Sequence, residues 1–273
     1  MTDSIALEGA LVKSQAAPMG AALAKTWSAA RLMAIRSLRL SLRAIDGLVV
    51  ALALPVILMG LFVYLFGGAI RTGASYIDFV VPGVLVVCIG YSAVTTSISV
   101  AHDLNEGMVD RLRSMDVGGV SFMSGHVLAG AVRNLISTVI VLGVAFAMGF
   151  RPHAGGLQWL EALGLLALCV LAYTWLTATL GTLARSAEAA NGMGFLVGFV
   201  AYPSSAFVPV KDMASWVRGF ADHQPVTPIV DTLRGLLDGA RGTDTWVAAA
   251  WCLGIIALSV ALAGWLFRLR TQR

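Results

Sequence analysis

The chain has 273 residues, of which 58% are hydrophobic and only 12% are charged, and its formal net charge is +4. A soluble domain carries more charge on its surface than this, so the composition excludes an ordinary soluble globular protein and indicates an integral membrane protein. The length suits one helical domain of about six spans at ~20 residues each, which we place at residues 46–273.

Two segments precede the first predicted span. Residues 1–19 are polar and rich in Ala, Gly and Ser, and no short hydrophobic stretch with a cleavage site follows them, so we expect a disordered tail and no signal peptide. In residues 20–45 apolar side chains recur every three or four positions, and the basic residues lie largely off that stripe. This pattern predicts an amphipathic helix in the membrane interface; a lead-in that only sets topology is a compatible alternative.

Six apolar stretches approach the length needed to cross the hydrocarbon core. Backbone polar groups find no water there, so we expect each stretch to be a helix and the whole chain to be all-α. The fifth stretch is the least hydrophobic. The predicted spans are 48–66, 79–100, 127–149, 159–183, 191–208 and 246–267.

The distribution of Lys and Arg predicts the orientation. With the N-terminus inside, thirteen of the 19 basic residues fall in the inner segments and six in the outer segments. Positive residues gather on the cytoplasmic side of membrane proteins. We therefore expect a multi-pass protein of the cell (plasma) membrane with both termini in the cytoplasm.

A charged stretch, "DLNEGMVDRLRSMDV" at residues 103–117, separates the second and third predicted spans. Asp103 and Glu106 have the spacing of an N-terminal capping pair, and Gly118-Gly119 can end the helix that follows. Leu104, Met108, Leu112 and Met115 would share one face. The pattern predicts a short cytoplasmic amphipathic helix, and the residues alone leave a solvated connecting helix equally open.

The outer loop, residues 209–245, carries two apolar stripes. Met213, Trp216, Val217 and Phe220 form the first. After it, Thr227 is a candidate N-cap with Pro228 at the first helical position, and Gly239 can end this second helix. Its predicted apolar face consists of Ile229, Val230, Leu233, Leu236 and Leu237. We expect two short helices that cap or re-enter the outer leaflet.

The sequence lacks the motifs of an ATP-hydrolysing domain or of a metalloprotease active site. No G-x-x-x-x-G-K-[ST] phosphate loop and no H-E-x-x-H motif occurs, so we expect a non-catalytic chain without a catalytic or metal site. An ion-coupled transporter should carry an acid in mid-span, and none is predicted there, while Arg133 and Glu161 are expected near span ends where they can snorkel. These features favour a transporter powered by another protein.

Four stretches in this order resemble the type-2 ABC exporter permeases of the daunorubicin-resistance branch. They are "RAIDGL" leading into a span with a central proline, "FVVPGVLV" at the second span, the charged stretch 103–117, and "HQPVTPIVDTLRG" before the last span. The resemblance covers residues ~25 to 270. One departure is Asp116, where the family usually has proline, so the sequence does not fix how sharply the charged helix ends.

The resemblance implies half of a transporter. A separate ABC ATPase in two copies would bind ATP and Mg, a second permease chain (identical or related) would complete the membrane part, and the substrate would be an amphipathic drug, an antibiotic or a lipid. The charged stretch would then be the coupling helix seated on the ATPase, with Asp103, Glu106, Gly107, Asp110, Arg111, Leu112 and Arg113 as its candidate contacts. The outer re-entrant motif would comprise Pro225, Thr227, Pro228, Leu233, Arg234 and Leu236.

Two other classes stay open at this stage. One is an ion-coupled secondary transporter or channel, which would move solute without ATP. The other is a membrane scaffold that transports nothing, which would lack an ATPase partner. A phosphate-loop protein encoded beside this chain would favour the ATP-driven class. No feature suggests a nucleic-acid partner, and no residue can be assigned to the substrate path.

Overall fold

The computed structural model describes residues 45–67, 75–106, 119–240 and 245–271. The predicted N-terminal tail and interfacial helix, residues 1–19 and 20–44, lie outside the described residues. Every regular element in the described part is helical. The elements are α3 (Ile45–Leu61), η1 (Phe62–Phe66, a π-helix), α4 (Tyr76–Asn105), α6 (Gly119–Ala147), α7 (Gly156–Leu183), α8 (Ala187–Phe199), η2 (Val210–Asp212), α9 (Ser215–His223), α10 (Val226–Leu237) and α11 (Thr245–Thr271).

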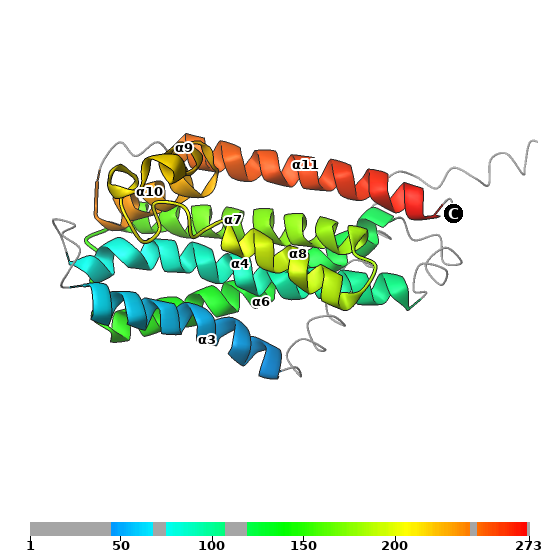
Figure 1. The fold of residues 1–273 in the computed structure, drawn as a ribbon, viewed down its shortest axis with the longest axis horizontal. Helices are drawn as coiled ribbons and strands as arrows, with labels where there is room; N and C mark the ends of the chain where they lie inside the picture. The colour runs from blue at the N-terminus through cyan, green and yellow to red at the C-terminus, as the bar shows by residue number, and fades with distance from the viewer. Residues whose placement is uncertain (1–44, 68–74, 107–118, 241–244, 272–273) are drawn as a thin grey trace, which may run out of the picture.

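The long helices lie side by side, with α4 in the middle of the bundle (Figure 1). It packs against α3, α6, α7, α8 and α10. Of the most apolar part of α4, 83% is buried within the bundle, compared with 22% for α11. The described chain begins with α3 and ends with α11 toward one end of the bundle, and α9 and α10 lie at the opposite end (Figure 1).

Four helices are long and apolar enough to cross a membrane: Tyr76–Asn105, Phe122–Ala147, Gly156–Leu183 and Thr245–Leu266. They correspond to the second, third, fourth and sixth predicted spans. The first predicted span forms α3, which contains Pro55, followed by the π-helical turns of η1, and its apolar helical part is shorter (Leu52–Leu65). The structure therefore confirms an all-α fold with membrane-length helices.

The fifth predicted span is not one continuous helix. α8 has 13 residues, which is about 20 Å at ~1.5 Å per residue and too short for a hydrocarbon core of ~30 Å. The chain then turns through residues 200–208. Pro203 disfavours helical geometry in the residue before it, and the Ser204 hydroxyl bonds the backbone at Ala201 and Ala206. Hydropathy alone cannot detect this break because the turn is also apolar.

Two tryptophans mark the length of α11. Trp246 and Trp265 are 72% and 59% exposed, and 19 residues separate them along one helix. This places them about 28 Å apart at ~1.5 Å per residue, close to the thickness of the hydrocarbon core. Tryptophan favours the two membrane–water interfaces, so their spacing fits a helix that crosses the bilayer with one face toward lipid.

Glycine allows the backbones of a neighbouring helix and of the turn after α8 to approach α4 closely. A Cβ at Gly181 of α7 would lie 2.5 Å from the carbonyl oxygen of Ser97, and a Cβ at Gly83 would lie 2.5 Å from that of Ala206. Apolar helices gain little hydrophobic energy from one another in lipid, so close packing of this kind is a main source of association.

We expect Gly181→Val to destabilise the bundle by ~1–3 kcal/mol, since the backbone at Ser97 cannot move aside as a side chain could. Gly164→Val is the matched control, because Gly164 lies on the same helix and its Cβ would meet nothing within 4 Å. Thermal unfolding of both purified variants in detergent measures the difference. Equal midpoints would contradict the close approach of α7 to α4.

Candidate functional site

Only residues 103–106 of the predicted coupling stretch fall in described residues. Gly107, Asp110, Arg111, Leu112 and Arg113 lie outside the described residues. Asp103 and Glu106 can be placed. The predicted helix itself therefore stays a prediction.

Asp103 and Glu106 do not begin a new helix. α4 continues to Asn105, and Glu106 is its C-cap, whose N–H donates to the carbonyl of His102 (3.0 Å). The predicted capping pair is wrong because residues 101–105, including the buried Ala101 and Leu104, continue the helix beyond the predicted end at residue 100. At the other side of the connection, Gly119 opens α6.

Each acid instead pairs with a histidine. Oδ2 of Asp103 lies 3.2 Å from Nε2 of His126 on α6, and both side chains are buried. Oε1 of Glu106 lies 3.3 Å from Nε2 of His102, and both of these are exposed. Asp103 therefore faces the interior of the bundle, whereas Glu106 remains on the surface.

The two short helices predicted before the last span are present as α9 and α10, with one correction at the start of α10. The helix begins at Val226 after Pro225, so Thr227 is not its N-cap. The Thr227 hydroxyl donates to the carbonyl of Ala221 on α9 (2.6 Å) and joins the two short helices. Pro228 lies in the first turn, where its missing N–H costs no hydrogen bond. Gly239, with φ of +79°, follows the helix as predicted.

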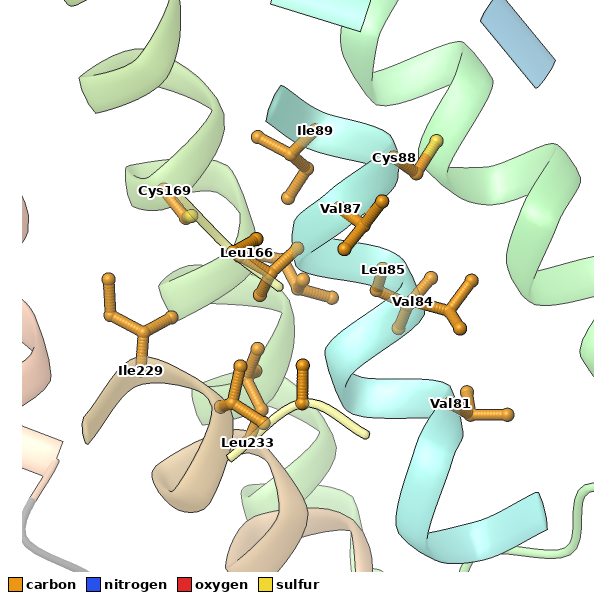
Figure 2. Packing of buried hydrophobic residues seen from close by; sticks show 14 of the residues in the cluster. Val81, Val84, Leu85, Val87, Cys88, Ile89, Leu166, Cys169, Ile229 and Leu233 are labelled. Carbon is orange, nitrogen blue, oxygen red and sulfur yellow. The ribbon is translucent and has the colours of Figure 1, made fainter. Parts of the chain in front are cut away.

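The apolar face of α10 is buried in the main core. Its five predicted residues are at most 2% exposed, namely Ile229, Val230, Leu233, Leu236 and Leu237. Figure 2 shows Ile229 and Leu233 pointing into the cluster to which Leu166 of α7 and Leu85 of α4 also contribute. α10 is therefore part of the packed bundle and not a solvated loop.

Arg234 joins α10 to two other segments at this end. Its Nε donates to the carbonyl of Phe79 in α4 (3.1 Å), and its Nη2 donates to the carbonyl of Ser205 in the turn after α8 (2.7 Å). Nη1 contacts Oδ1 of Asp231 (2.7 Å), and the guanidinium carbon lies 3.8 Å from the centroid of the Phe79 ring. Burial lowers the pKa of the Arg234 guanidinium, and Asp231 partly opposes this by raising that pKa.

The sequence analysis predicts Arg234 as a residue of the motif before the last span, but it does not predict the carbonyls to which Arg234 donates. Its carbonyl acceptors lie about 30 and 155 residues away in the chain, and no pattern in the sequence links such positions. Gln224 was also missed: its side chain donates to the carbonyl of Pro203, in the same turn.

Arg133 lies deeper than predicted. α6 starts at Gly119 and not near residue 127, so Arg133 is midway along the helix and only 7% exposed. Its Nη2 donates to Oγ1 of Thr96 on α4 (3.0 Å), and Nδ2 of the adjacent Asn134 donates to the carbonyl of Ile89 (2.9 Å). Glu161 is exposed in the second turn of α7, near a helix end as predicted.

The comparisons with known proteins agree on one family. A family model described as ABC-2 type transporter matches residues 29–237. A daunorubicin resistance ABC transporter permease of Streptomyces coeruleorubidus is 27% identical over 218 residues, which cover 79% of this chain and 77% of that protein. A probable doxorubicin resistance ABC transporter permease of Mycobacterium tuberculosis is 27% identical over 224 residues, covering 78% of this chain and 79% of the relative.

We expect Arg234→Lys to destabilise the outer end by ~1–3 kcal/mol, because an ammonium group cannot reach both carbonyls and the Phe79 ring at once. Arg218→Lys is the control, since Arg218 also donates to two backbone carbonyls but is exposed. Thermal unfolding in detergent separates the two variants. A loss no greater for Arg234→Lys than for Arg218→Lys would contradict the anchoring role.

Proposed function

The chain belongs to the ABC-2 type transporter family, and we propose that it is the membrane permease of an ABC exporter. A separate ATPase drives it to move a hydrophobic or amphipathic drug or lipid out of the cytoplasm or the inner leaflet. The observation that carries the proposal is the family match from residue 29 to residue 237, which runs from before α3 to the end of α10.

The energy source is inferred from what this chain lacks and from where its acids lie. The sequence has no phosphate loop, so ATP and Mg would be bound by the partner, in two copies. In the four described spans the acids lie toward helix ends, at Asp78, Asp103 and Glu161. A mid-span acid for ion coupling is absent from these helices, which favours ATP over an ion gradient.

The substrate class is inferred from the relatives and from the surface of the bundle. The two relatives are named for resistance to daunorubicin and doxorubicin, which are amphipathic molecules. The outward faces of α6, α8 and α11 are apolar, with residues such as Val139, Leu196 and Leu258 each more than 60% exposed. Surfaces of this kind suit lipid, an amphipathic substrate or a second permease chain, and we propose that the active unit contains two permease chains.

The connection between α4 and α6 is proposed to seat on the ATPase. Its candidates are Gly107, Asp110, Arg111, Leu112 and Arg113, with exposed Glu106 beside them. Asp103 leaves this set of direct contacts because it is buried against His126.

The functional test uses the chain co-expressed with an ATPase subunit encoded beside it. We expect the two to co-purify and inverted membrane vesicles to accumulate daunorubicin only when ATP is supplied. A variant ATPase without its phosphate-loop lysine is the control and should abolish accumulation. ATP-independent flux through the isolated permease would favour a secondary transporter, and failure of both co-purification and transport would favour a scaffold.

The proposed topology puts both termini in the cytoplasm of a plasma-membrane protein. We expect a reporter after Arg273 to be active only inside and a reporter in residues 241–244 to be active only outside, because positive residues are retained on the cytoplasmic side. Activity of paired reporters that require opposite compartments provides the measurement. An external C-terminus would overturn the orientation.

A further inference from the structure

The ion pair between Asp103 and His126 differs from the other two described ion pairs in its burial. Its side chains are 12% and 5% exposed. In the pair of His102 with Glu106 both side chains are at least 60% exposed, and in the pair of Arg234 with Asp231 the acid is 50% exposed. Among the ion pairs of the described residues, only this one has both partners withdrawn from solvent.

The pair lies on both sides of the connection between two long helices. Asp103 is in the last turn of α4, and His126 is near the start of α6. The ion pair between them therefore joins the two helices on either side of that segment.

A small apolar cluster, separate from the main core, surrounds this position. The Phe122 ring meets the His126 ring edge-on, with centroids 4.7 Å apart. The cluster draws on four helices and consists of Val100, Leu104, Phe122, Met123, Val127, Ala178 and Ala263. The pair thus sits where α4, α6, α7 and α11 converge at one end of the bundle, opposite α10.

Stability alone does not explain a polar pair in such a place. Well-packed apolar side chains often hold helices together as well as a buried ion pair does, or better, because they avoid the cost of desolvating charge. An ion pair differs from an apolar contact in holding two particular groups together, so it specifies the register of the two helix ends. A pair that fixes register is useful where motion must pass from one element to another.

We propose that Asp103 and His126 are positioning residues that lock the end of α4 to the start of α6, so that motion of the connection is transmitted to both helices as one unit. This inference rests on the proposed function, in which the connection seats on an ATPase. The pair touches neither ATP nor substrate. It determines how much transport each hydrolysed ATP produces.

The main test is the double variant Asp103→Leu/His126→Leu in the full permease–ATPase complex, with daunorubicin as the probe. The apolar pair keeps the helices packed but removes the ion pair. We expect normal membrane abundance, thermal midpoint and ATPase co-purification, while daunorubicin transported per ATP hydrolysed falls about tenfold. The control is His102→Leu/Glu106→Leu, which removes the neighbouring exposed pair and should leave that ratio unchanged.

A second comparison keeps the inference falsifiable if the double variant fails to fold. The amide nitrogen of His126→Gln reaches about as far as Nε2, whereas that of His126→Asn reaches only as far as Nδ1. We expect His126→Gln to retain transport per ATP within about twofold and His126→Asn to lose about tenfold. Equal ratios for the two amides, or a wild-type ratio for the double leucine variant, would overturn the inference.

The wild-type complex separates this inference from the proposed function. If the wild-type complex shows no ATP-driven daunorubicin transport, the proposed function fails for this probe. If wild-type transports and the variants lose ATPase co-purification in proportion to transport, the pair merely supports docking and the positioning role is wrong.

Discussion

The enclosure of α4 by other helices is the constraint on which the rest of the bundle depends. Helices in lipid gain little hydrophobic free energy by associating, so a helix becomes buried only if its neighbours pack closely against it or form hydrogen bonds with it. α4 satisfies both conditions. Its neighbours approach through small residues, as at Gly181 against Ser97 and Gly83 against Ala206, and its remaining surface is covered by α3, α6, α7, α8 and α10.

Polar contacts hold α4 at three depths. At the end near α10, Arg234 donates to the carbonyl of Phe79, and in the middle Arg133 donates to Thr96. At the other end Asp103 pairs with His126. Two of these contacts tie α4 to α6 and one ties it to α10. Contacts from two neighbouring helices therefore hold α4 near both of its ends and between them.

Sequence patterns predicted the features that depend on composition, and missed those that depend on distant partners. Four long spans and the buried face of α10 follow from apolar length and period. The break after α8 was missed because the turn around Pro203 is apolar too. The capping role predicted for Asp103 and the snorkelling role predicted for Arg133 were wrong for the same reason. Both predictions depended on helix boundaries, and α4 ends later and α6 begins earlier than the hydropathy pattern indicated. The partners His126 and Thr96 lie on a different helix and leave no local pattern.

The packing of the described interior also bears on where a substrate can pass. Many of its buried hydroxyls bond carbonyls of their own helix, as Thr174 does with Val170 and Thr177 with Tyr173, so they present methyl groups to their neighbours. α7 approaches α4 so closely at Gly181 that a single added carbon would overlap the backbone at Ser97. A drug-sized molecule needs far more room than this between α4 and α7. Within the proposed function, this packing favours a path along an outward apolar face of the bundle over one between α4 and α7 at Gly181.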